Sequence, residues 1–235
     1  MAESQSAQLD ALADALCATL PQPQVHASEP GTVDNQAMFA LSYGLFVLSA
    51  REGERDNACI INTAAQVTDT PKRISITVNK QNLTHDMILK TGVFNLSVLS
   101  QDAAFAQFQQ YGFRSGRDTA DKFDGAEAVR TANGLRYEPA GTNAVLSGKV
   151  IQTLDCGTHT LFLAEVTEAR VLSAVPSATY AYYFEHIKPK PQPAAEKKTG
   201  FVCKICGYVY EGETLPEDYI CPLCKHGAED FEPLK

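Results

Sequence analysis

From about residue 38 onward, apolar residues come in short runs that are separated by polar turn residues. The runs are rich in Val, Ile, Phe and Thr, a composition that is typical of strands. An aromatic segment, residues 180–187, follows the last of them. The predicted strands cover residues 38–50, 58–68, 73–80, 92–100, 144–156 and 159–173.

The N-terminal segment has a helical pattern instead. Four leucines fall on one face of a helix predicted over residues 6–20, namely Leu9, Leu12, Leu16 and Leu20. A polar, proline-rich stretch then leads to residue 37. Residues 1–37 are therefore predicted to form a helical arm, which packs either on the main domain or on a partner subunit.

Two more helices are predicted among the strands. The first covers residues 83–92, with Thr84 as its cap and Gly92 as its stop. The second covers residues 101–112, and a charged loop with three glycines follows it up to residue 125. Many strands with a few inserted helices predict a mainly β fold, a small β-barrel with helical decoration.

A second, smaller domain is predicted at the C-terminal end. Residues 188–200 are rich in Pro, Lys and Ala and have no apolar face, which is typical of a linker. The domain boundary is placed there. The main domain is expected to cover residues 38–187 and the small domain residues 201–235.

Charge and composition narrow the classes of function. The chain has 235 residues, is 44% hydrophobic and carries a net charge of −8. Nucleic acids and anionic membrane surfaces select basic faces, so neither is an expected partner. The first residues lack the basic region of a signal peptide, and the longest strongly apolar run, residues 37–50, is too short to span a bilayer. We therefore expect a cytoplasmic protein.

The seven cysteines form two groups. Cys17, Cys59 and Cys156 are isolated, and we interpret them as small buried apolar residues. The other four have the spacing Cys-x2-Cys-x14-Cys-x2-Cys, as Cys203, Cys206, Cys221 and Cys224. Without a signal peptide, this spacing favours a metal site over disulfides. Four thiolates suit zinc or iron, so the spacing alone leaves both metals open.

The residues around the four cysteines favour iron. Gly207 follows the first pair, and a glycine there lets the chain turn so that backbone N–H groups approach the sulfurs. The tail is also acidic, whereas a zinc ribbon that binds nucleic acid is usually basic. Aromatic residues supply a core for so small a domain: Tyr208, Tyr210, Tyr219 and Phe231.

The segments CKICGYVY and CPLCKHGAEDFE, within residues 201–232, closely resemble rubredoxin. The resemblance implies one iron between the four cysteine thiolates, which shuttles one electron. Two features depart from the pattern. The gap between the cysteine pairs is shorter than in free-standing rubredoxins, and Lys225 stands where many of them have glycine. Structural zinc is the alternative.

An iron that takes one electron needs a donor, and a flavin can connect it to a two-electron hydride donor. No Gly-x-Gly-x-x-Gly follows a strand, so a Rossmann cofactor domain is not supported. Residues 62–88 instead gather Asn, Thr and Gln side chains at strand ends, and backbone N–H groups near Thr84 are placed to receive a phosphate. By itself, this pattern also fits an ordinary polar strand end.

Residues 38–187 as a whole resemble the flavin reductase-like, FMN-binding split-barrel family. The segments that carry the resemblance are YGLFVLS, NTAAQVTDTP, VNKQNLTHDMI, GVFNLSVLS, GFRSGRD with the following DKF, and GTHTLF. It implies a homodimer with FMN near the subunit interface and NADH or NADPH as electron donor. With the tail, the chain resembles high-molecular-weight rubredoxins, flavin–rubredoxin fusions that act as NAD(P)H:rubredoxin oxidoreductases and feed flavodiiron proteins, which reduce oxygen or nitric oxide.

The resemblance also implies roles for residues of the main domain. Four are expected along the isoalloxazine ring and ribityl chain: Asn62, Thr63, Gln66 and Thr68. Four more are expected at the ribityl–phosphate end, where a lysine supplies positive charge: Asn79, Lys80, Asn82 and Thr84. Ser115 and Arg117, in the glycine-rich loop, are expected to touch the cofactor as well.

His159, in CGTHTLF, corresponds to a Gly-x-His-type motif near the flavin and the nicotinamide. It is the expected catalytic residue, and its task is to orient the reactants rather than to transfer a proton. His85 is expected to be a helix residue near the site and not a participant. Two alternatives stay open, an FMN and iron carrier without an NAD(P)H site, and a ligand-binding split barrel with a zinc-stabilised tail.

Overall fold

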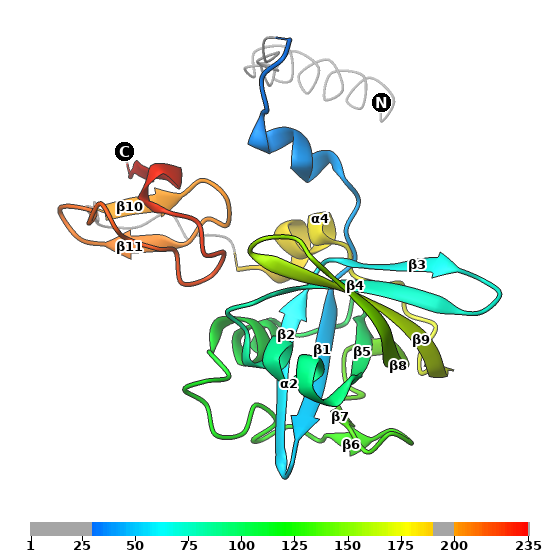
Figure 1. Cartoon of the computed structure of the whole chain (residues 1–235). Coiled ribbons are helices and arrows are strands. Elements are labelled where there is room, and N and C mark those ends of the chain that lie inside the picture. Colours follow the sequence, from blue (N-terminus) through cyan, green and yellow to red (C-terminus); the bar gives the residue numbers. More distant parts are fainter. Residues whose placement is uncertain (1–29, 190–199, 235) are drawn as a thin grey trace, which may run out of the picture. The chain divides into compact units, whose positions relative to one another are not determined.

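The computed structural model describes residues 30–189 and 200–234 (Figure 1). The chain divides into two compact units, Met1–Leu41 and Ser42–Lys235. In the first unit, η1, Asn35–Ala40, is a short 3-10 helix. The helix predicted over residues 6–20 lies outside the described residues, as does Cys17. In the described part of the chain, no helix is long and apolar enough to cross a membrane.

Within residues 30–189, seven strands form one antiparallel sheet in the order β2-β1-β5-β8-β9-β4-β3. The strands are β1 Phe46–Glu52, β2 Arg55–Ile61, β3 Ala64–Thr68, β4 Arg73–Asn79, β5 Val93–Leu99, β8 Thr142–Asp155 and β9 His159–Val171. β2 and β3 are the two edges of this sheet, yet only residues 62 and 63 separate them in the chain. The sheet must therefore curl until its edges meet at that point, which gives a barrel that is split along the rest of those edges. The mainly β fold is confirmed.

Helices and two very short strands surround the barrel. α2, Leu83–Thr91, packs against β1 and β2 (Figure 1). The remaining elements are α3 Phe105–Phe108, the π-helix η2 Gln109–Phe113, β6 Val129–Arg130, β7 Arg136–Tyr137, α4 Tyr180–Tyr182 and the π-helix η3 Tyr183–Ile187. The aromatic segment 180–187 is thus helical.

Two predicted strands have different bounds in the structure. The first was expected over residues 38–50 but begins at Phe46, because Met38 and Leu41 are exposed and lie before the sheet. The second, expected over residues 58–68, is two strands, because the chain passes from one edge of the sheet to the other at residues 62 and 63.

The C-terminal end of α2 is as predicted, but its N-terminal cap is not. Gly92 ends the helix with a left-handed backbone, φ 69°, and its N–H donates to Ile88 O at 2.8 Å. The N-cap is Asn82 and not Thr84, which was the wrong choice. Thr84 lies in the first turn and is fully buried, where its hydroxyl accepts a hydrogen bond from Asn57 Nδ2 at 2.8 Å.

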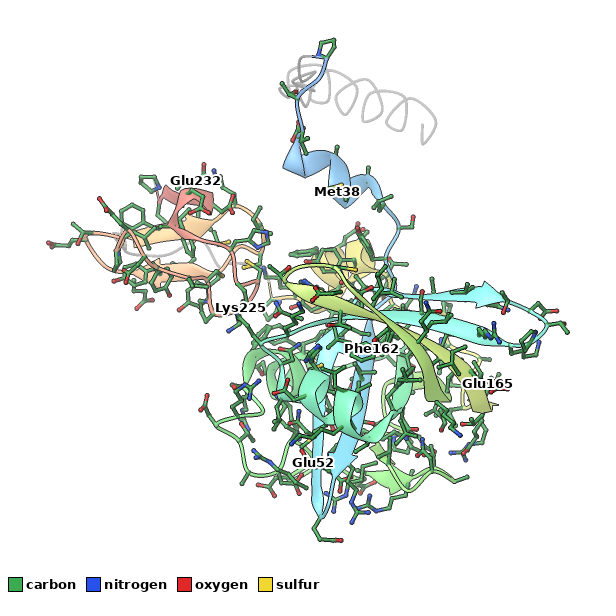
Figure 2. The ribbon with its side chains drawn as sticks, in the orientation of Figure 1. Met38, Glu52, Phe162, Glu165, Lys225 and Glu232 are labelled. Carbon is green, nitrogen blue, oxygen red and sulfur yellow. The ribbon has the colours of Figure 1, made fainter. Side chains whose placement is uncertain are left out.

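The core of the barrel has two halves, and β1 contributes to both. Leu48 and Ala50 belong to the buried cluster that also contains Phe162, which Figure 2 labels. Leu45, which precedes β1, and Val47 belong to a second cluster, which packs under α3, η2 and η3. Because consecutive residues of β1 face opposite sides, the strand is buried on both faces and reads as an apolar run.

The two isolated cysteines in the described residues differ. Cys59 is partly buried against the barrel core, and burial raises the pKa of its thiol to about 11. Cys156 is exposed in the turn between β8 and β9, so its interpretation as a buried residue is wrong. A two-strand turn offers no core to bury it.

Residues 200–234 form the small C-terminal domain. Three short strands lie in the order β11-β10-β12, and they are β10 Gly200–Cys203, β11 Val209–Glu211 and β12 Phe231–Pro233, with the 3-10 helix η4 Ala228–Asp230 between the last two. Phe231 packs with three buried cysteines, and Tyr219 crosses it edge-on at 5.4 Å. Domains below about 40 residues usually need a metal or a disulfide to be stable.

Candidate functional site

The four cysteines of the C-terminal domain converge on one point. Their Sγ atoms lie within 4.8 Å of one another. Cys203 Sγ is 3.5 Å from Cys224 Sγ, and Cys206 Sγ is 3.4 Å from Cys221 Sγ. Four sulfurs that each bind one metal ion at 2.3 Å in a tetrahedron lie about 3.8 Å apart. The cage therefore has the size of a four-coordinate metal site.

The two cysteine pairs lie on equivalent turns. Gly207 N–H donates to Cys203 O at 2.7 Å, and Lys225 N–H donates to Cys221 O at 2.9 Å. Both donors have a left-handed backbone, with φ of 70° at Gly207 and 63° at Lys225. In the described part of the chain, Lys225 (labelled in Figure 2) is the one residue other than glycine with a positive φ. The lysine thus keeps the turn and bears backbone strain that glycine would not.

Replacing Lys225 by glycine is expected to stabilise the C-terminal domain. The left-handed conformation costs a residue with a side chain roughly 1–2 kcal/mol, and the greater freedom of glycine in the unfolded chain takes back part of that gain. We expect a net gain of about 0.5–1 kcal/mol, measured by denaturant unfolding of the metal-loaded protein through its thiolate absorption. Lys204→Gly, at a residue without positive φ, is the control and should destabilise the domain, because glycine adds freedom to the unfolded chain and the hydrogen bond from Lys204 Nζ to Glu229 O is lost.

Backbone hydrogen bonds favour negative charge on the cysteine cage, whereas the contact with Cys206 raises the pKa of Cys224. A hydrogen bond from Cys224 lowers the pKa of the Cys206 thiol to about 5, whereas burial raises the pKa of Cys221 to about 11. Backbone N–H groups of Tyr208 and His226 donate to the sulfurs of Cys206 and Cys224. Four adjacent thiols cannot all lose their protons without a cation. The donor set therefore fits a metal ion held by four thiolates.

A second candidate site lies in the main domain, where β4 ends and α2 begins. Asn79, the last residue of β4, pairs with His159, the first residue of β9. The N–H of Lys80 donates to Thr158 O at 3.0 Å, which closes this end of the sheet. Asn82 follows as the N-cap of α2. The structure thus brings three of the four residues expected at the phosphate end to one place.

The loop after η2 reaches the same place. Arg117 Nε donates to Gln81 O at 3.1 Å, and the Ser115 hydroxyl accepts the N–H of Arg117 at 3.1 Å. Gly116 lies on the side chain of Asn57, where a Cβ atom would meet Asn57 Oδ1 at 2.3 Å. Only glycine fits this close approach. Ser115 and Arg117 therefore lie beside the start of α2.

We call Asn79, Lys80, Asn82, Ser115 and Arg117 the polar cluster, and titratable groups lie beside it. His159 Nδ1 lies 2.8 Å from the Thr158 hydroxyl. Burial, and then the nearby His85, lower the pKa of His159, so its imidazole is neutral at pH 7. Lys80 Nζ forms an ion pair with Asp155 Oδ1 at 2.7 Å, in which the Asp155 side chain is 73% exposed.

The residues expected along the flavin ring separate into two groups. Thr63 lies beside the polar cluster, because Thr63 Oγ1 donates to Thr77 O at 2.6 Å and Thr77 N–H donates to Thr63 O at 3.0 Å. Thr77 is two residues before the end of β4, and Asn62 precedes Thr63 in the chain. The structure therefore places Asn62 and Thr63 near Asn79.

Gln66 and Thr68 lie farther along the same hairpin. The register pairs Gln66 with Ile74 and Thr68 with Arg73. Ile74 is about 17 Å from the end of β4, at 3.3 Å per residue. Gln66 borders a groove of about 340 Å³ with apolar side chains from β1, β5, β8 and β9. The structure therefore does not place these two residues in the polar cluster.

Sequence reasoning missed two supports of the polar cluster, which are the buried Lys122 and the first turn of α2. Lys122 is 1% exposed, and its ammonium group donates to Tyr111 O and Arg114 O, at the two ends of the turn before Ser115. Burial lowers the pKa of Lys122 to about 8. Asp86, in the first turn of α2, forms an ion pair with Arg117 of the polar cluster, and its other oxygen contacts His85. The only local signal was an acid in the first turn of a helix, a common pattern.

Residues 38–190 match the flavin reductase like domain family, and residues 201–232 match the rubrerythrin, rubredoxin-like domain family. A high molecular weight rubredoxin from Moorella thermoacetica is 36% identical over 230 residues, which covers 86% of this chain and 100% of that protein. A ferric-chelate reductase (NAD(P)H) from Archaeoglobus fulgidus is 34% identical over 151 residues, which covers 64% of this chain and 89% of that protein.

The fold has relatives among solved structures. The NADH:FAD oxidoreductase SgcE6 of Streptomyces globisporus has a TM-score of 0.55 at 21% identity, and the match covers 67% of this chain and 93% of that one. The flavin reductase PheA2 has a TM-score of 0.53 at 18% identity, covering 63% of this chain and 93% of that one. At these identities the likeness concerns the fold of the main domain.

Proposed function

The chain belongs to the flavin reductase-like family and carries the rubredoxin-like domain of the high-molecular-weight rubredoxins, and we propose its function on that basis. We propose that it oxidises NAD(P)H with FMN as the hydride acceptor. The electrons then pass through its own iron site to an acceptor protein. Residues 38–187 would be the flavin module and residues 201–235 the iron module, joined by the linker 188–200. The observation that carries the proposal is the cage of four thiols, within 4.8 Å of one another, in one chain with a flavin reductase-like barrel.

The two groups supply complementary chemistry when bound. A flavin connects a two-electron hydride donor to one-electron acceptors, and iron between four thiolates takes up one electron at a time. The N–H groups that donate to Cys206 and Cys224 support a metal held by thiolates, because such contacts stabilise thiolate charge, and the match to the rubredoxin-like family favours iron over zinc. Cys203, Cys206, Cys221 and Cys224 would hold the metal.

The polar cluster would bind the phosphate end of FMN. The start of α2 offers backbone N–H groups and the positive end of a helix dipole. Lys80 and Arg117 add positive charge, and Asn79, Asn82 and Ser115 add polar atoms. Thr84 is buried beneath this surface, so its part is to hold Asn57 and, through it, Gly116.

His159 would orient the flavin and the nicotinamide. It lies at the start of β9, opposite Asn79, and its lowered pKa keeps the ring neutral at pH 7. A neutral imidazole carries one N–H donor and one acceptor nitrogen, so it can hydrogen-bond to either reactant. Asn62 and Thr63 would lie along the flavin, next to Thr77. Gln66 and Thr68 would reach the cofactor only if the ring extends along the β3–β4 hairpin.

Two kinds of partner belong to the proposal. A second copy of the chain would pack on the barrel, which exposes apolar side chains of its two longest strands: Ile151 at 43%, Leu154 at 60% and Val171 at 84%. The acceptor would be a protein such as a flavodiiron protein, and the acidic tail would steer it through a basic patch on its surface.

Anaerobic stopped-flow mixing tests the reaction. FMN-loaded protein mixed with NADH or with NADPH is expected to lose its flavin absorption first and its thiolate-to-iron absorption afterwards, because the electrons enter at the flavin. A matched sample of the Cys203→Ser variant should show the first phase alone. If neither nucleotide bleaches the flavin, the protein is a carrier that another protein reduces. Zinc in place of iron by elemental analysis would contradict the iron module.

A further inference from the structure

One series of polar contacts connects the three elements around the polar cluster, which are the loop after η2, the first turn of α2 and the start of β9. Arg117 Nη2, from the loop after η2, donates to Asp86 Oδ2 at 2.8 Å. The other carboxylate oxygen, Asp86 Oδ1, lies 3.0 Å from His85 Nδ1. His85 Nε2 in turn lies 2.9 Å from the hydroxyl of Thr160, the residue after His159 on β9. The loop, the first turn of α2 and the start of β9 are thus connected through two adjacent side chains of α2.

This series of contacts is anchored in the core. His85 is 4% exposed, and its ring lies edge-on to Phe162 with centroids 5.7 Å apart. Asp86 is partly exposed; burial opposes its charge, but the hydrogen bonds from His85 and Arg117 lower the pKa of its carboxyl group. Asp86 is therefore ionised at neutral pH, and both of its oxygens have a partner.

Arg117 is held in place by two contacts of different kinds. Nε donates to the backbone oxygen of Gln81 at 3.1 Å, and Nη2 donates to Asp86. These use two of the five N–H groups of a guanidinium, so donors are left for a ligand. Lys80 differs, because within the described residues its ammonium group has a single contact, the ion pair with Asp155, whose side chain is 73% exposed. Of the two cations, Arg117 is the one with a fixed position.

We propose that Asp86 and His85 are positioning residues that hold Arg117 as a fixed cation for the phosphate of the flavin nucleotide. The inference rests on the proposed function, since it names how the same site selects a phosphorylated flavin. A planar guanidinium in a fixed orientation offers two parallel N–H donors to a phosphate. Riboflavin, which has no phosphate, does not use this group.

Removing the charge of Asp86 has two opposing effects on a bound phosphate. The carboxylate repels the phosphate, so its loss favours binding. The carboxylate also holds the guanidinium of Arg117 in one orientation, so its loss leaves that group mobile and disfavours binding. The Asp86 and Arg117 side chains are 38% and 48% exposed, and water and salt screen the repulsion at such a site. We therefore expect the loss of positioning to outweigh the loss of repulsion.

The test is the affinity of the full-length chain, freed of flavin, for FMN and for riboflavin, measured by quenching of flavin fluorescence. In Asp86→Asn the dissociation constant for FMN is expected to rise about tenfold, while that for riboflavin changes less than twofold. Arg117→Lys, which keeps the charge but lacks the planar fork, should weaken FMN selectively as well. Glu54→Gln, which removes a carboxylate that is likewise paired with an arginine, Arg51, but lies at the β1–β2 turn, should change neither constant.

The possible outcomes separate the inference from the function on which it rests. FMN bound as tightly by Asp86→Asn as by the wild type, or more tightly, would overturn the positioning role. Equal weakening of FMN and riboflavin would also overturn it, because a general structural role predicts that result. A wild-type chain that binds neither flavin would overturn the proposed function, and this inference with it.

Discussion

Replacing Cys203 by serine is expected to abolish electron transfer from the protein to an acceptor and to leave NAD(P)H-dependent reduction of the flavin intact. Cys203 is 1% exposed, and its sulfur lies 3.5 Å from that of Cys224. A serine hydroxyl is shorter and is not ionised at neutral pH, so the cage loses one of four thiolates. Metal binding and the folding of a domain this small depend on each other, and we expect both to fail.

The Cys203→Ser substitution should leave the fold of the barrel unchanged. Its two buried clusters contain no residue of the cluster around the cysteines. The measurements are iron content, visible absorption, steady-state NAD(P)H oxidation with free FMN as acceptor, and reduction of an acceptor protein. Cys156→Ser is the matched control, because Cys156 is exposed and outside the cage. Equal loss of flavin reduction and acceptor reduction in Cys203→Ser would contradict two separable modules.

The metal site was predictable because its signal is local. Each cysteine pair lies on one turn, and Gly207 has the positive φ that its position after the first pair predicts. To bring the two cysteine turns together at one metal, the short chain between them needs to fold back only once. Lys225 shows the limit of this reasoning, because it stands where many rubredoxins have glycine, and the sequence alone did not show that the backbone is left-handed all the same. The hydrogen bond from Lys225 N–H to Cys221 O is indifferent to the side chain.

The strands of the barrel were also predictable in kind, because β-rich apolar runs bury themselves in few other ways. β4 and β5 have nearly the predicted bounds. The break at residues 62 and 63 was not predictable, since it follows from where the sheet edges meet and not from a turn residue. The same holds for the first predicted strand, whose early residues are apolar but have no neighbouring strand.

The polar cluster was predictable only in part. Asn79 and Lys80 stand at a strand end that the sequence marks clearly, and Arg117 lies in a loop rich in glycine. What ties them together is not local. Asp86 meets Arg117 across 31 residues, and His85 meets Thr160 across 75. Single-sequence patterns report neighbours within a helix turn or a hairpin, so contacts of this separation become visible only in the structure.

Replacing Phe162 by alanine should destabilise the barrel by about 3–5 kcal/mol, the usual cost of emptying a buried aromatic position. Phe162 is fully buried, on a strand that pairs with β4 and β8, and its neighbours come from β1, β4, β5 and α2. These elements are held by the sheet, so they cannot collapse into the space that the ring leaves. The free energy of unfolding in urea, followed by flavin or tyrosine fluorescence, measures the effect.

The control for that change is Val129→Ala, on the short strand β6, where the side chain is 45% exposed. It should alter the free energy of unfolding by less than about 0.5 kcal/mol. Phe162 also supports the ring of His85, edge-on at 5.7 Å. Because His85 connects to Asp86 and hence to Arg117, we expect Phe162→Ala to weaken FMN binding even under conditions where the barrel is still folded. A folded Phe162→Ala variant with unchanged FMN affinity would show that the polar cluster does not depend on the core beneath it.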